Sequence, residues 1–63
     1  MKLSERIIAY RASKGLSQED FAELVGVKRL TIFNIENEKS KPQKTTEYKI
    51  NKVLEDFENE RKN

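Results

Sequence analysis

The stretch between residues 28 and 37 holds the side chains whose chemistry is easiest to define. It fits a helix whose inward side carries Ile32 and Ile35, three positions apart. The opposite face of that helix would present Lys28, Arg29, Leu30, Phe33 and Asn34. The major groove of duplex DNA admits one α-helix, and cations and amides can hydrogen bond to base edges and phosphates there. This outer face is therefore the candidate surface for reading DNA.

Composition excludes most other chemistry. The chain has 63 residues with no cysteine and no histidine, so it lacks thiol nucleophiles, disulfides and the commonest general base and transition-metal ligand. We expect no enzymatic activity, no metal and no cofactor. No apolar run approaches the roughly 20 residues that span a bilayer, and no signal-peptide core follows the N-terminus. The expected location is the bacterial cytoplasm, associated with the nucleoid and not with a membrane.

Positive charge gathers in the middle of the chain. The net charge is only +2, but residues 24–52 contain seven lysines and arginines against three glutamates. The flanking segments are acidic or mixed in charge. A charge run of this kind is commonly a solvated face, and charge alone favours that interpretation over a nucleic-acid partner.

The first half of the chain predicts two helices. One covers residues 3–14, with Ser4 able to cap it and Gly15 able to end it; its inward side would carry Leu3, Ile7, Ile8 and Tyr10 or Arg11. The next opens with Ser17 and Asp20 in the spacing of a capping box. Its inward face would carry Phe21, Leu24 and Val25, with the small Ala22 beside them. Gly26 then permits a sharp turn, because glycine adopts positive φ without steric cost.

The second half predicts two further helices. Residues 28–37 form the third, with Val27, Ile32 and Ile35 inward. The fourth starts near Thr45 or Thr46, after Pro42, and has an apolar stripe at Ile50, Val53, Leu54 and Phe57. No segment alternates as a strand would, so the expected fold is all-α. We predict one domain over residues 1–58 and a frayed polar tail over residues 59–63.

The spacing of these residues resembles the phage Cro/repressor type of helix-turn-helix, the XRE-like family. The resemblance covers roughly residues 3–54. It rests on the run Gly15-Leu16-Ser17-Gln18-Glu19-Asp20-Phe21-Ala22, then Val25-Gly26-Val27, Thr31-Ile32, Ile35-Glu36-Asn37, Lys39 and Pro42. It implies a four-helix helix-turn-helix domain, here without the family's usual fifth helix, with residues 28–37 as the recognition helix.

The resemblance also implies roles for individual residues. Gln18 matches the position where a helix N-terminus meets a phosphate or a base. Lys28, Arg29 and Leu30 match the first turn of the recognition helix, with Asn34 one turn further on; arginine can pair with guanine and asparagine with adenine. Lys39, Lys41 and Lys44 match the loop beside the DNA backbone. Arg11 and Glu36 match a pair that ties the first helix to the end of the third, a structural role that we prefer to DNA contact.

The sequence departs from the family pattern at several positions. Glu38 stands where a glycine is usual, and we expect Asn37 to supply the left-handed residue instead, because asparagine tolerates that conformation. Asn51 occupies a position that is usually small and apolar. With no fifth helix expected, the stripe of the fourth helix either closes a minimal core or pairs in part with another chain.

Leu30 and Phe33 are unusual on a face that the family keeps polar. Three interpretations stay open: they contact thymine methyl groups in DNA, they bind a protein partner, or the helix is turned so that Phe33 lies in the core.

Two functions follow from these alternatives. The first is a sequence-specific transcriptional regulator of phage or prophage type that binds double-stranded operator DNA, expected as a homodimer. The second is an antirepressor or modulator that binds another helix-turn-helix repressor through Leu30 and Phe33.

Overall fold

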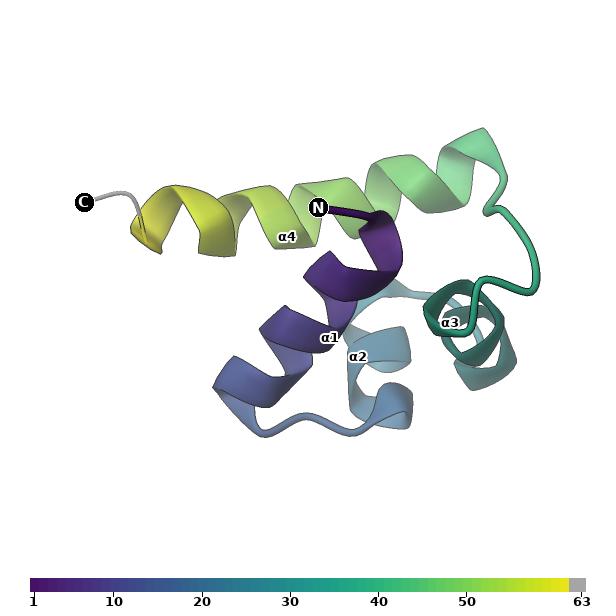
Figure 1. Cartoon of the computed structure of the whole chain (residues 1–63), viewed down its shortest axis with the longest axis horizontal. Coiled ribbons are helices and arrows are strands. Elements are labelled where there is room, and N and C mark those ends of the chain that lie inside the picture. Colours follow the sequence, from purple (N-terminus) through teal and green to yellow (C-terminus); the bar gives the residue numbers. More distant parts are fainter. Residues whose placement is uncertain (62–63) are drawn as a thin grey trace.

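The computed structural model describes residues 1–61 and consists of four α-helices (Figure 1). They are α1 (Leu3–Lys14), α2 (Gln18–Val25), α3 (Arg29–Glu36) and α4 (Lys44–Arg61). Residues 1–61 contain no strand, so the predicted all-α fold with four helices is confirmed. None of the helices in this part of the chain is long and apolar enough to cross a membrane.

Local sequence signals set the ends of α2. The Ser17 hydroxyl accepts from the Asp20 N–H at 3.0 Å, and the Ser17 N–H donates to the Asp20 carboxylate at 3.1 Å, which confirms the predicted capping box. Gly26 ends the helix with φ +91°, a left-handed conformation that allows the chain to turn directly into α3.

The N-terminus of α1 differs from the prediction. The helix begins at Leu3 with Lys2 as the N-cap residue, so Ser4 lies inside the first turn and is buried. The capping partner is Glu5, whose carboxylate accepts from the Lys2 N–H at 2.9 Å. Ser4 can cap a helix, but Lys2 and Glu5 cap α1 instead.

One apolar core joins all four helices. Within it, Tyr10 makes edge-to-face contacts to Phe21 and Phe57 at ring-centroid distances of 5.4 and 5.1 Å. The buried apolar residues are Ile7, Tyr10, Phe21, Ala22, Val25, Ile32, Ile35, Ile50 and Leu54. Leu3 and Val27 pack against this core and are partly buried, as the predicted inward positions require.

Two residues predicted to face inward are exposed. Ile8 is 47% and Leu24 54% exposed, so both predictions are wrong. Successive helix residues turn by about 100°, and Ile8 lies about 100° from the middle of the buried stripe that Ser4, Ile7 and Tyr10 form on α1. Leu24 lies about 100° from the middle of the stripe that Phe21, Ala22 and Val25 form on α2. Short helices bury only one narrow stripe.

In Figure 1, α4 runs across the top of the other three helices, and its apolar stripe completes the core. Ile50 and Leu54 are fully buried, and Val53 and Phe57 are partly buried at the rim. The predicted stripe is therefore confirmed, and most of it is covered within the chain. α4 continues through residues 59–61; residues 62 and 63 lie outside the described part, so the frayed tail stays a prediction.

The polar side chain of Asn51, at a position that is usually apolar, has a partner in Arg6. Arg6 donates to the Asn51 side-chain oxygen at 3.0 Å and, through two nitrogens, to the Glu58 carboxylate at 2.8 and 2.9 Å. Hydrogen bonds to Glu58 raise the pKa of Arg6 above its ordinary value. This cluster ties the start of α1 to the middle and the C-terminal part of α4.

Candidate nucleic-acid interface

The outer face of α3 carries the residues that the sequence analysis placed on it. The helix is one residue shorter at each end than predicted, because Lys28 and Asn37 are its capping residues. Lys28 and Arg29 are exposed, Leu30 is 59% exposed, and Asn34 is partly buried. The N-terminal turn of α3 thus presents two cations and one large apolar side chain together.

Phe33 does not belong to the core. Ile32 is fully buried and Ile35 nearly so, and these two residues fill the inward side of α3. Phe33 is partly buried beside that face, and the Lys39 ammonium lies 5.1 Å from the centre of its ring. The interpretation with α3 turned inward at Phe33 is therefore wrong, and a cation–π contact links the helix to the lysine-bearing loop.

The loop after α3 begins with a left-handed residue, and that residue is Glu38. Its φ is +56°, whereas Asn37 has φ −93°, so the prediction that Asn37 takes this conformation is wrong. The Glu38 N–H donates to the Ile35 carbonyl at 3.1 Å and the Lys39 N–H to the Asn34 carbonyl at 2.8 Å, the two bonds of a Schellman motif. This pattern fixes the left-handed position one residue after the cap. The Asn37 amide instead donates to the Phe33 carbonyl at 2.8 Å.

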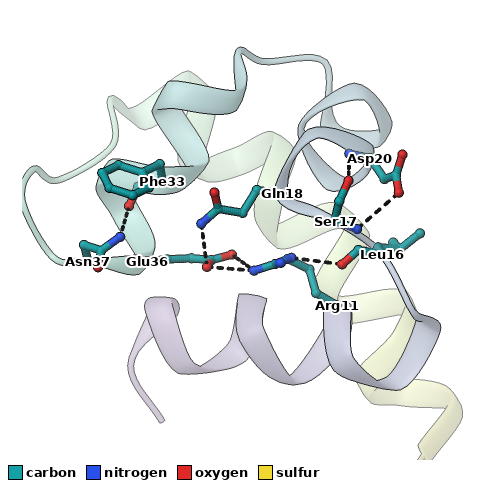
Figure 2. Close-up of polar contacts among 8 residues, drawn as sticks. All are labelled: Arg11, Leu16, Ser17, Gln18, Asp20, Phe33, Glu36 and Asn37. Carbon is teal, nitrogen blue, oxygen red and sulfur yellow. Dashed lines mark hydrogen bonds and ion pairs between the residues drawn. The ribbon is translucent and has the colours of Figure 1, made fainter.

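A polar network holds α1, α2 and α3 together behind this face. In Figure 2, the side chains of Arg11, Gln18 and Glu36 point toward one another from the three helices. One Arg11 nitrogen (Nη1) donates to both Glu36 oxygens at 2.8 Å, and another (Nε) donates to the Leu16 carbonyl at 3.2 Å. The Glu36 side chain is only 7% exposed. These bonds fix the end of α3 relative to the start of α2.

Gln18 has a partner that the sequence analysis missed. It is the first residue of α2, and its amide nitrogen donates to a Glu36 oxygen at 3.0 Å. The two residues are 18 positions apart, and no local pattern relates them. An amide group has two N–H donors, so one hydrogen bond to Glu36 orients the Gln18 side chain and leaves the second donor available.

Exposed cations continue from α3 along the loop. Lys39, Lys41 and Lys44 are all exposed, like Lys28 and Arg29. Two acids lie between residues 28 and 44, and one of them, Glu36, is neutralised by Arg11. The other, Glu38, is exposed and lies 3.4 Å from the ammonium of Lys2. Lys2 is far from this segment along the chain, so no local sequence pattern relates it to these cations.

Comparisons with known proteins agree with this arrangement. A family model described as Helix-turn-helix matches residues 7–55. An uncharacterized HTH-type transcriptional regulator from Archaeoglobus fulgidus is 44% identical over 49 residues, which are 78% of this chain and 70% of the relative. No solved structure matches the chain significantly. The match begins within α1 and covers all of α2 and α3 and most of α4, and the chain therefore belongs to the XRE-type helix-turn-helix family.

Proposed function

We propose that this protein is a DNA-binding transcriptional regulator that places the N-terminal half of α3 in the major groove. The observation that carries the proposal is the exposed cationic face of α3, whose opposite face is anchored in the core by Ile32 and Ile35. A helix held rigidly from behind can present its outer side chains to base edges in a fixed register. The name of the Archaeoglobus fulgidus relative, an HTH-type transcriptional regulator, supports the same function.

The base-reading residues would be those on α3. Arg29 is exposed in the first turn and can pair with guanine through two hydrogen bonds, and Asn34, one turn further on, can pair with adenine. Leu30 and the exposed part of Phe33 can pack on thymine methyl groups. Specificity would therefore combine hydrogen bonds with apolar contacts.

The remaining candidates would position the protein on the DNA backbone. Lys28, Lys39, Lys41 and Lys44 are exposed along one path from α3 to the start of α4. Gln18 lies at the N-terminus of α2, where backbone N–H groups favour a phosphate, and Glu36 orients its amide. Such contacts contribute affinity without reading sequence.

The proposed assembly on DNA is a homodimer on an operator of phage or prophage type. A helix of eight residues reaches only a few base pairs. Two copies on half-sites about 34 Å apart, one turn of DNA, would double the contacts and match a palindromic site.

A salt titration tests the proposal. Four phosphate contacts per protomer predict that the logarithm of the DNA association constant falls with the logarithm of salt concentration with a slope of about −3 to −4 per protomer. Fluorescence anisotropy with a labelled duplex measures this slope. Absence of binding to any duplex at low salt would end the proposal.

Two variants separate base reading from backbone binding. Arg29→Ala should weaken binding to the operator about tenfold or more and leave nonspecific binding nearly unchanged, whereas Lys41→Gln should weaken both equally. Lys52→Gln is the matched control for Lys41→Gln: it makes the same charge change, and Lys52 lies about 200° around α4 from the buried Ile50.

Because Leu30 is an exposed apolar side chain, a second candidate function is an antirepressor that binds another helix-turn-helix repressor through α3. Leu30→Ser distinguishes the two. Loss of a protein complex with intact DNA binding would support the antirepressor, and weakened DNA binding with no protein complex would support the regulator.

A further inference from the structure

A groove of about 620 Å³ separates the N-terminus of α1 from the loop that follows α3. Its apolar floor includes Leu3 and Ile35. Three lysines line it: Lys2 from the α1 side, and Lys39 and Lys41 from the loop. The groove therefore brings a cation from the start of the chain beside the lysines that we assign to the DNA backbone.

Glu38 lines the same groove. Its carboxylate is 3.4 Å from the Lys2 ammonium, and both side chains are mostly exposed. Glu38 also holds a left-handed backbone conformation that glycine would adopt without strain. An exposed ion pair contributes little to stability, so the pair does not offset that strain. Strained residues often mark sites where function, not stability, selects the side chain.

We infer that Lys2 is a further contact to the DNA backbone. In the free protein, the Glu38 carboxylate binds the Lys2 ammonium at the position that a DNA phosphate takes in the complex. The inference rests on the proposed DNA-binding function. As a phosphate approaches Lys39 and Lys41, Lys2 exchanges the carboxylate for the phosphate oxygen. Glu38 thereby lowers the affinity of the whole loop, because its charge both competes for Lys2 and repels the phosphate.

A double-mutant cycle on DNA affinity tests this exchange. Glu38→Gln keeps the length of the side chain and its strained backbone and removes only the charge. It should raise the affinity for duplex DNA about threefold to tenfold at low salt, with the gain shrinking as salt rises. In the Glu38→Gln background, Lys2→Gln should remove most of that gain and reduce the magnitude of the salt slope by about 1, the loss of one phosphate contact.

The single variant Lys2→Gln should change DNA affinity less, because Lys2 already forms an ion pair with Glu38 in the free protein. Lys52→Gln is again the matched charge control and should not couple to Glu38→Gln. Far-UV circular dichroism of each variant checks that the helices are intact, as expected for exposed side chains.

The outcomes separate this inference from the proposed function. If the wild-type protein binds duplex DNA but Lys2→Gln and Lys52→Gln act alike in the Glu38→Gln background, Lys2 is no backbone contact and the inference is wrong. If Glu38→Gln leaves affinity and slope unchanged, the role of Glu38 is wrong. Failure of the wild-type protein to bind any duplex would instead overturn the proposed function itself.

Discussion

Replacing Arg11 with methionine should remove a large part of the stability of this domain. Arg11 donates to both Glu36 oxygens and to the Leu16 carbonyl. Methionine keeps most of the apolar stem but none of the donors. The variant would leave the Glu36 carboxylate, 7% exposed, with the Gln18 amide as its hydrogen-bond partner. A buried charge without its counter-ion is expensive.

The size of the effect follows from burial. Breaking a fully buried ion pair by removing one partner costs about 3–5 kcal/mol. The Arg11 side chain is 23% exposed, so water can partly solvate the site, and we expect a loss of about 2–3 kcal/mol. A domain of this size has a total stability of only about 3–9 kcal/mol. At about 4–8 °C per kcal/mol, Tm should fall by roughly 8–24 °C.

Urea unfolding followed by far-UV circular dichroism measures this loss. The matched control is Arg11→Met combined with Glu36→Leu, which should recover much of the stability because no buried charge remains. The loss should persist in 0.5 M salt, because salt screens a largely buried pair weakly. If Arg11→Met changes the free energy of unfolding by less than about 0.5 kcal/mol but weakens DNA binding, Arg11 is a DNA contact and the structural role is wrong.

Three smaller effects are expected. Ser17→Ala removes the hydroxyl that accepts from Asp20 and should cost about 1 kcal/mol in urea unfolding; an unchanged midpoint would mean that the capping box contributes nothing. Gly26→Ala should cost about 1–2 kcal/mol through backbone strain alone, since φ is +91° and an added Cβ would meet no atom within 4 Å; Gly26→Asn should cost less, and the reverse order would contradict this explanation. Glu38→Gly should stabilise the protein by about 0.5–1 kcal/mol, because relief of left-handed strain exceeds the added entropy of the unfolded chain. Thermal unfolding checks it, with Glu38→Gln expected near the wild-type Tm.

The features predicted correctly from sequence are those whose cause is local. The capping box depends on two residues three positions apart, and the turn after α2 depends on Gly26 alone. The buried stripe of α4 repeats at helical spacing over two turns. Each of these signals lies within a few residues of the structure that it determines.

The wrong or missing predictions concern features that depend on contacts between helices or on the hydrogen bonds at a helix end. Spacing alone does not decide whether Ile8 joins the buried stripe beside Ile7; the packing of α1 against α3 and α4 decides it, and Ile8 is exposed. The left-handed residue is Glu38 because the last hydrogen bonds of α3 place it there, although asparagine tolerates that conformation better. The Gln18–Glu36 bond joins two helices, and helical periodicity carries no information about it.

The exposure of Leu30 and Phe33 bears on whether α3 binds DNA or a protein partner. A protein-binding patch needs a contiguous apolar area of several hundred Å². Phe33 is partly buried and the Lys39 ammonium lies over its ring, so it adds little open apolar surface. Leu30 is then a single exposed apolar side chain beside Lys28 and Arg29, which is too small for a protein-binding patch but sufficient to meet one thymine methyl group. The small apolar surface of α3 therefore fits DNA better than a protein partner, and we expect Leu30→Ser to weaken binding most where the operator places a thymine opposite residue 30.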